Sequence, residues 1–221
     1  MIARPYVIVA TCALMTLASV VAVIAWRFAI FVVPFQLTGE PVRIADLLGL
    51  KPGSVVADIG AGDGALAVEM ARVVGPRGVV YATELSSQRR SEIARRASNA
   101  GTPQVRIVEA RTDLTQLPEQ CCDAVYMRTA LHHITDPQAY AREVVKAVRP
   151  GGRVAVIDFA PGALWFHGRD HGIQADNVIH AFQQVGMSLT QRIEDWGGGT
   201  YLILFERPRA AVHRFPYSVK T

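Results

Sequence analysis

Three glycines at alternate positions, Gly60, Gly62 and Gly64, stand beside two acids, Asp58 and Asp63, in the stretch VVADIGAGDGALA. Glycine allows a turn to adopt positive φ and lets a ligand approach the backbone closely. The spacing GxGxG differs from the GxGxxG of dinucleotide sites, and the carboxylates of Asp58 and Asp63 would repel a pyrophosphate. The turn therefore favours a phosphate-free ligand that carries a cationic centre and an ammonium group.

Two further acids follow expected strands. Glu84 closes VVYATE about 20 residues after the turn, where an acid holds ribose hydroxyls. Nicotinamide-dependent dehydrogenases share this feature, and the alternative is a surface acid near the cap of the next helix. Asp113, in EARTDLTQLP, could accept a hydrogen bond from an adenine amino group, although loop aspartates also serve as ordinary turn residues.

Two adjacent histidines, His132 and His133, follow another expected strand in ALHHITD. Because imidazole titrates near neutrality, both are candidates for a catalytic base if the acceptor of a reaction loses a proton. The alternative is that one of them packs in the loop. Asp158, at the end of a later strand, could point into the cleft or pair with a histidine, and Asp136 is expected to cap the helix that begins at Pro137.

A loop after the fifth expected strand carries four more side chains that could form a lid or an acceptor-binding surface: Trp165, Phe166, His167 and His171. The histidines of this loop and the pair at 132–133 match no metal-binding template in their spacing, so we expect no metal site.

Strand and helix patterns alternate through the chain, which predicts βαβ units and a mainly parallel sheet. The expected strands are 54–60, 78–84, 104–110, 122–128 and 153–159, and the expected helices are 65–75, 87–101, 136–152 and 175–186. The last two strands, 188–195 and 200–206, are separated only by WGGG, so they must run antiparallel as a hairpin.

These motifs together resemble a known family. VVADIGAGDG, Glu84, LPEQCCDAVYMRTALHHITDP and VVKAVRPGGRVAVIDF are similar to successive motifs of class I S-adenosylmethionine (AdoMet)-dependent methyltransferases. Within that family they are most similar to the small-molecule enzymes of ubiquinone and menaquinone biosynthesis. The resemblance extends from about Pro41 to about Arg207. It implies an α/β, Rossmann-like, seven-stranded and mostly parallel sheet with a C-terminal antiparallel hairpin.

The resemblance also implies AdoMet as the cofactor, whose sulfonium and amino group fit the acidic turn. The AdoMet contacts that we expect are Asp58, Gly60, Ala61, Gly62, Gly64, Glu84 and Asp113. The family usually has Gly-Asp at the end of the third strand, where this chain has Ala110–Arg111, so Asp113 is the nearest substitute. RPGG and the terminal hairpin argue against a nicotinamide oxidoreductase.

The first part of the chain is different in composition. No charge occurs from Tyr6 to Trp26, and a helix of that length spans about 30 Å, the hydrocarbon thickness of a bilayer. We therefore expect a transmembrane anchor, with a cleaved signal peptide as the alternative. The expected domains are an anchor at 1–36, a methyltransferase domain at 37–208 and an irregular tail at 209–221.

The remaining composition limits the function classes. The net charge of +4 is spread along the chain without a basic run, so we expect no nucleic-acid partner. The three cysteines, two of them adjacent, are not a disulfide framework and fit a reducing compartment.

The sequence thus predicts AdoMet-dependent methyl transfer to a small-molecule or lipidic acceptor. It predicts a single-pass membrane protein whose catalytic domain faces the cytoplasm, where AdoMet is found. The alternatives are a degenerate methyltransferase-like binding protein and, less favoured, a nicotinamide oxidoreductase. The acceptor and the oligomeric state stay open.

Overall fold

The computed structural model describes residues 19–23, 39–163 and 171–209 of the chain. The chain divides into two units, residues 1–40 and 41–221, and each is described by itself. In the first unit, residues 19–23 are helical and their valines are exposed. Most of the expected anchor falls outside the described residues. Within the described ranges, no helix combines the length and the apolar character needed to cross a bilayer.

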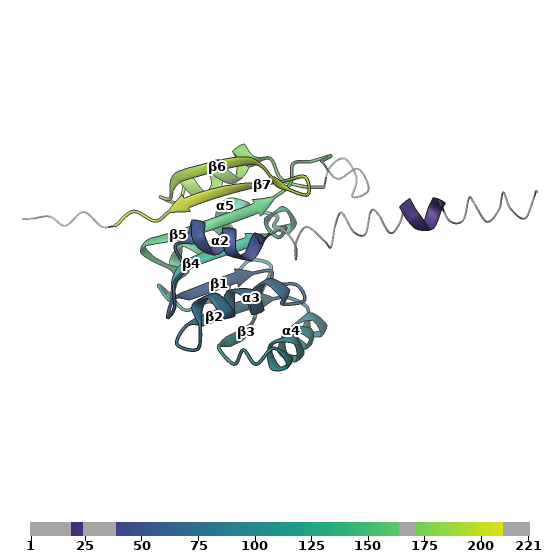
Figure 1. Cartoon of the computed structure of the whole chain (residues 1–221). Coiled ribbons are helices and arrows are strands. Elements are labelled where there is room, and N and C mark those ends of the chain that lie inside the picture. Colours follow the sequence, from purple (N-terminus) through teal and green to yellow (C-terminus); the bar gives the residue numbers. More distant parts are fainter. Residues whose placement is uncertain (1–18, 24–38, 164–170, 210–221) are drawn as a thin grey trace, which may run out of the picture. The chain divides into compact units, whose positions relative to one another are not determined.

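Helices and strands alternate in the second unit, as the sequence predicts (Figure 1). The elements are α2 (Glu40–Leu48), β1 (Val55–Ile59), α3 (Ala65–Val74), β2 (Val79–Glu84), α4 (Ser87–Asn99), β3 (Val105–Glu109), β4 (Cys122–Arg128), η1 (Leu131–His133), α5 (Pro137–Ala147), β5 (Val148–Asp158), α6 (Ala175–Gln183), β6 (Ser188–Gly197) and β7 (Thr200–Glu206).

Local sequence signals explain where several helices begin and end. The Asp136 side chain caps α5 by accepting from the backbone N–H of Ala139 at 2.9 Å, as predicted. Ser86 caps α4 in the same way. Helix α3 ends at Gly75, which adopts positive φ. The start of α6 is at Ala175 with Gln174 as its cap.

The sheet has seven strands in the order β3-β2-β1-β4-β5-β7-β6. Strands β1 to β5 are parallel, and β7 runs antiparallel to both β5 and β6. This confirms the predicted Rossmann-like sheet with its terminal hairpin. The strand order reverses between β1 and β4, and ligands of open α/β sheets bind beyond the carboxyl ends of the strands at such a point. Those ends lie toward the right of Figure 1.

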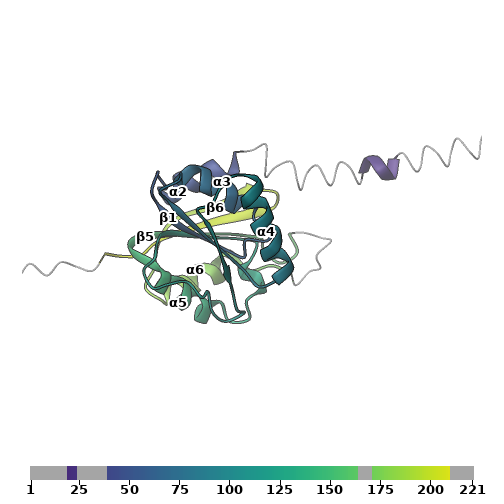
Figure 2. The same cartoon turned by 90° about the horizontal axis from the view of Figure 1, so that it is seen from below.

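Helices cover both faces of the sheet. Figure 2 shows α2, α3 and α4 on one side and α5 and α6 on the other. Ala57 and Ile59 of β1 belong to the core that includes α5 and α6. Because side chains alternate along a strand, Asp58 between them faces the α3 side.

The RPGG motif has a structural role that the sequence analysis did not predict. Strand β5 begins at Val148, earlier than expected, and its pairing with β4 shifts register between Cys122 and Ala124. Gly151 has φ +81°, and its N–H donates to Arg207 O at 2.7 Å. A Cβ at Gly152 would lie 2.7 Å from Asp123 O. The two glycines therefore let β5 enter the sheet between its neighbours.

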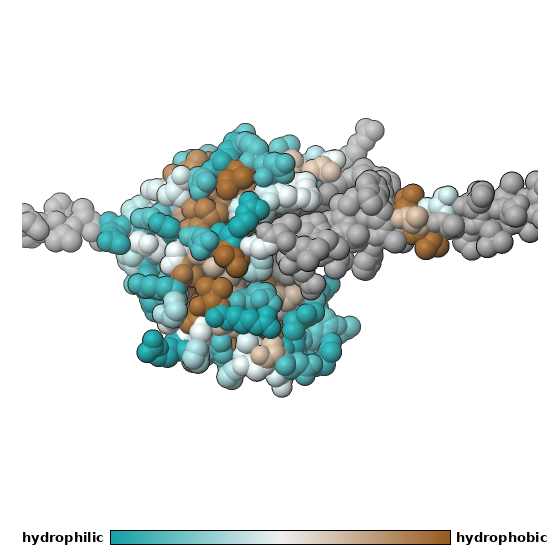
Figure 3. Space-filling view, viewed as in Figure 1, coloured by the Kyte–Doolittle hydropathy of each residue, from teal (hydrophilic) through white to brown (hydrophobic). Residues whose placement is uncertain are grey.

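The face of this unit that Figure 3 shows is largely hydrophilic, with apolar side chains gathered near α2. Val42 of α2 is an exposed hydrophobic residue. Cys121 and Cys122 pair as a vicinal disulfide at the start of β4. Because the two residues are adjacent, this bridge links no separate elements.

Candidate cofactor and acceptor site

The glycine turn follows β1 and leads into α3, and its three glycines have different roles. Gly60, Gly62 and Gly64 adopt φ values of +73°, +57° and +79°. A Cβ at Gly60 would lie 2.8 Å from the Cβ of Ala130, and one at Gly64 would lie 3.0 Å from the side chain of Ile93. At Gly62 the nearest atom is 3.7 Å away. Gly60 and Gly64 therefore serve packing within the protein, whereas a Cβ at Gly62 would make an ordinary van der Waals contact with the Arg89 side chain.

The backbone amides of this turn are already used within the protein. Of the six N–H groups from Gly60 to Ala65, five donate to internal acceptors. Gly60 and Ala61 donate to Thr83 O, Gly62 to the Glu84 carboxylate, Gly64 to Ala61 O and Ala65 to the Asp63 carboxylate. A pyrophosphate site requires such amides to point at the ligand. The turn consequently offers little to a phosphate group.

Glu84, at the end of β2, lies against the turn. Its Oε2 accepts from Gly62 N at 3.0 Å, and its Oε1 accepts from Ser86 N at 3.0 Å. These two bonds fix the carboxylate between the glycine turn and the start of α4. The structure therefore places Glu84 beside the turn, rather than on a surface remote from it.

Asp58 is buried beneath the turn. It is 2% exposed, and its register partner on β4 is Tyr126. Burial raises the pKa of Asp58 to about 7, and the nearby Tyr126 hydroxyl and Arg128 offset part of the rise. In the described structure, Asp58 Oδ2, the Tyr126 hydroxyl and Thr83 Oγ1 are buried without a well-aligned hydrogen bond, although the Tyr126 hydroxyl is close enough to Asp58 to stabilise its carboxylate.

An unpartnered buried polar group costs about 1–3 kcal/mol. A ligand with hydrogen-bond donors would remove that cost at Asp58. AdoMet offers such donors in its ammonium, ribose hydroxyl and adenine amino groups. The acceptors at Asp58 and Glu84 thus fit the cofactor that the sequence resemblance implies.

The other two acids near this edge lie differently. Asp63 Oδ2 is 2.6 Å from Arg96 Nη2, and Arg96 Nε donates to Asp63 O. The negative charge of Asp63 is therefore compensated by Arg96, which corrects the expectation that Asp63 repels a phosphate. Asp113 is largely exposed and forms an ion pair with Arg111 at 3.5 Å. Its contact with adenine stays a prediction.

The two candidate bases lie in η1, directly after β4. His132 Nδ1 is 2.7 Å from Asp158 Oδ1, and the side chains of His132 and Asp158 are 2% and 0% exposed. The same carboxylate accepts from the backbone N–H of His132 and of Phe159. Asp158 therefore holds the His132 ring at its Nδ1 edge, which leaves Nε2 directed away from the carboxylate.

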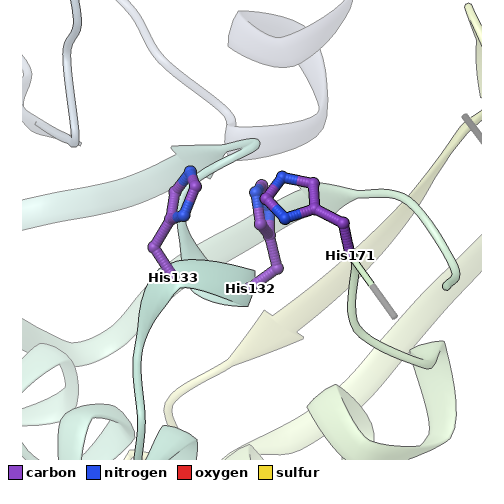
Figure 4. A group of neighbouring side chains, drawn as sticks. All are labelled: His132, His133 and His171. Atoms are coloured by element: carbon purple, nitrogen blue, oxygen red, sulfur yellow. The ribbon is translucent and has the colours of Figure 1, made fainter. Parts of the chain in front are cut away.

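Two more histidine rings lie beside His132 (Figure 4). The centroid of His132 is 4.0 Å from that of His133 and 4.5 Å from that of His171. His171 belongs to the segment between β5 and α6, whereas η1 follows β4. Because β4 and β5 are parallel neighbours in the sheet, the segments after their carboxyl ends lie side by side. Trp165, Phe166 and His167 of the same loop lie outside the described residues.

The glycine turn and the histidines form one site. Ala130, the residue that caps η1, is the one that a Cβ at Gly60 would meet. Thr129 before it adopts φ +50°, which is unusual for a β-branched residue, and its N–H donates to Ile157 O at 2.7 Å. This constrained backbone holds η1 against the turn, at the point where the strand order reverses.

Comparisons with known proteins agree with this geometry. Residues 57–156 match the model of a methyltransferase domain. The ubiquinone/menaquinone biosynthesis C-methyltransferase UbiE of Vibrio cholerae is 26% identical over 120 residues, which are 54% of this chain and 46% of that protein. Its counterpart in Hahella chejuensis is 28% identical over 116 residues, or 52% and 47% of the two chains. The chain thus spans about half the length of these curated relatives.

Solved structures share the fold. A SAM-dependent methyltransferase from Aquifex aeolicus superposes with a TM-score of 0.68 at 19% identity, covering 77% of this chain and 93% of that one. The [4+2]-cyclase SpnF superposes with a TM-score of 0.65 at 16% identity, covering 76% and 80%. At these identities the likeness concerns the fold alone.

Proposed function

We propose that this chain, whose residues 57–156 form a class I AdoMet-dependent methyltransferase domain, transfers the methyl group of AdoMet to a small-molecule or lipidic acceptor at a membrane. The family match confirms the resemblance seen in the sequence, with AdoMet as the implied methyl donor. The acceptor class, the membrane location and the roles of single residues are proposals.

One observation carries the choice of cofactor. The edge of the sheet at the glycine turn presents acceptors, the Asp58 and Glu84 carboxyl groups, while its backbone amides are already engaged. A dinucleotide would instead need backbone amides at this turn that are free to donate to its pyrophosphate. A cationic ligand with several donors is therefore favoured over a nicotinamide cofactor.

The residues have separable roles in this proposal. When bound, AdoMet supplies an electrophilic methyl group on a sulfonium. Glu84 would hold the ribose hydroxyls, and Asp58 would accept from the ammonium group. Gly62 would keep the turn backbone accessible to the ligand, since it carries no side chain and adopts positive φ. The protein aligns the reactants and excludes water, which supplies much of the acceleration in a displacement of this kind.

The histidine side of the site would receive the acceptor. Where the acceptor loses a proton on methylation, His132 Nε2 is the base that this chain offers, because Asp158 binds Nδ1 and orients the ring. His133 lies in ring contact with it and would line the same side.

The acceptor proposal draws on the relatives named above. The relatives are C-methyltransferases of ubiquinone and menaquinone biosynthesis by name, and the apolar stretch at residues 6–26 would keep this chain near apolar acceptors of that kind. We therefore favour a quinone-related or other lipidic acceptor over a water-soluble one.

Two measurements test the proposal. Calorimetric titration of the full chain with AdoMet is expected to give saturable binding, whereas NADH gives none. Membrane extract supplied with methyl-labelled AdoMet and the protein is then expected to yield a labelled product in the lipid fraction. Binding of NADH in place of AdoMet would reject the cofactor assignment.

A binding protein without catalysis is the second candidate. The fold alone does not decide between them, since a [4+2]-cyclase shares it. AdoMet binding without transfer to any component of the extract would favour this candidate.

A further inference from the structure

We propose that His132, His133 and His171 form a binding site for a divalent transition-metal ion of the zinc class, with Asp158 as the residue that positions His132. The ligating atoms that the three side chains offer lie within 4.8 Å of one another (Figure 4). Spacing in the sequence matches no metal template, because His171 is far from the pair along the chain. The fold supplies the missing proximity.

The distances are compatible with coordination after small side-chain movements. Zinc binds histidine nitrogen at about 2.0–2.1 Å, so the nitrogens of a tetrahedral site are about 3.4 Å apart. The widest separation here is 4.8 Å, and the nitrogens must therefore approach by no more than about 1.5 Å. His133 is exposed and His171 is half-buried, so rotation of these two side chains can supply the movement.

Asp158 provides an independent observation. A histidine that binds a metal through one nitrogen commonly donates its other N–H to a carboxylate, which fixes the ring and raises its basicity. The bond between His132 Nδ1 and Asp158 Oδ1, 2.7 Å long and shielded from solvent, has this form. It leaves Nε2 of His132 as the atom available to an ion.

The donor set indicates which ions fit. Three imidazoles, with no carboxylate or thiolate among the ligating atoms of the group, suit Zn²⁺, Ni²⁺ or Cu²⁺ and not Mg²⁺ or Ca²⁺. Three protein ligands leave a fourth position for water or for an oxygen of the acceptor, which is the arrangement of catalytic zinc sites.

This inference concerns the acceptor side and does not depend on AdoMet binding at the glycine turn. It does compete with the role of His132 as a base, because Nε2 cannot hold an ion and take up a proton together. Metal binding is measured without AdoMet, so its failure leaves the proposed methyl transfer untouched.

The test is a titration of the chelator-treated full chain with Zn²⁺, followed by competition with a chromophoric chelator. We expect one ion bound per chain with low-micromolar or stronger affinity, and no displacement by Mg²⁺. His133→Gln and His171→Gln are each expected to weaken binding about tenfold or more, and Asp158→Asn about 10- to 100-fold. Co²⁺ in place of Zn²⁺ should give the visible absorption of four-coordinate cobalt.

His180→Gln is the matched control, because His180 is an exposed histidine on α6 outside the cluster. Its affinity is expected to equal that of the unmodified chain. His133 is exposed, so its substitution keeps the fold, which thermal unfolding verifies. Unchanged Zn²⁺ affinity in both His133→Gln and His171→Gln, or an equal loss in His180→Gln, overturns the proposal.

Discussion

At the scale of single residues, the candidate site contains carboxyl groups that could accept hydrogen bonds from a ligand. Asp58 and Tyr126 are neighbours across β1 and β4, and Asp58 Oδ2 and the Tyr126 hydroxyl are buried beside each other with no other partner in the described residues. Such groups destabilise the fold unless a ligand satisfies them. The residues that bind a ligand are thus the ones that the folded protein leaves incompletely satisfied.

The raised pKa of Asp58 predicts a pH dependence of stability. Its pKa rises from 3.8 to about 7 on folding, because burial disfavours the carboxylate. Below pH 4 both states are protonated, whereas between pH 4 and pH 7 only the unfolded state ionises, and stability is lost as the pH rises. Asp58→Asn removes this penalty. The stability of the variant relative to the unmodified chain should therefore increase by a few kcal/mol from pH 4 to pH 8.

Urea unfolding at a series of pH values measures this difference. The comparison uses the change with pH and not the absolute stability, so any packing effect of the amide cancels. A difference that stays constant from pH 4 to pH 8 would show that Asp58 titrates normally in the folded protein.

Glu84 gives the second prediction at this scale. Glu84→Gln keeps the shape of the side chain but replaces one carboxylate oxygen by an NH₂ donor. We expect AdoMet affinity to fall about 5- to 150-fold, which corresponds to the loss of about 1–3 kcal/mol from a buried hydrogen-bonded pair. Calorimetric titration measures the loss.

The control for Glu84 is Glu119→Gln, because Glu119 is an exposed acid in the loop before β4. It makes the same chemical change away from the turn and should leave the affinity unchanged. Equal affinities for the Glu84 variant and this control would exclude Glu84 from the cofactor site.

At the scale of elements, the glycine turn and the segment before η1 are joined by one close contact. The absence of a Cβ at Gly60 lets the turn approach the Cβ of Ala130. Because β1 and β4 are neighbouring strands, their carboxyl-end loops meet here, and the packing couples the cofactor side to the histidine side.

This contact predicts a coupled pair of substitutions. Gly60→Ala places a Cβ 2.8 Å from that of Ala130 and puts alanine at positive φ, so we expect a loss of stability. Ala130→Gly in the same chain removes the clash and should restore part of the loss, leaving about 1–2 kcal/mol for the backbone strain. Thermal or urea unfolding of the two single variants and the double variant measures the coupling.

Gly62→Ala serves as the comparison, since a Cβ there would have space. Gly62→Ala introduces backbone strain without a clash at Ala130, so Ala130→Gly should restore none of the stability that this variant loses. If the effects of Gly60→Ala and Ala130→Gly simply add, the two loops are not in the contact that the structure gives them.

Sequence patterns predicted the elements better than the contacts between them. The alternation of strand and helix, the terminal hairpin and the Asp136 cap follow from local signals and agree with the structure. The early start of β5 could not be foreseen, because Pro150 and two glycines read as a helix stop. The meeting of His171 with His132 depends on strand order, which no local pattern specifies.

The same limit applies to charges. Asp63 was read as part of the ligand environment, but Arg96 from the next helix compensates it. Asp58 is also an aspartate, five positions earlier, yet it is buried, and Arg128 offsets only part of the rise in its pKa. Residue type and spacing located the site, whereas ionisation and pairing depend on tertiary neighbours.

At the scale of the whole molecule, the second unit contains a large hydrophobic core of its own. Its main hydrophobic cluster runs from β1 to β7 and includes α5 and α6, and among the described residues its first member is Ala57. Ile44, Ala45 and Leu48 of α2 are also buried. A chain that begins at residue 37 therefore retains every one of these apolar contacts.

Deletion of residues 1–36 tests this independence and the proposed anchor together. The shortened chain is expected to unfold cooperatively and to bind AdoMet within about twofold of the full chain, since all the proposed AdoMet contacts follow residue 36. The full chain should sediment with membranes and resist extraction by salt, because an apolar span inserts far more stably than a charged surface binds. The shortened chain should remain in the supernatant. Co-sedimentation of both forms would place membrane binding in the second unit, and loss of cooperative unfolding in the shortened form would show that the first 36 residues contribute to its core.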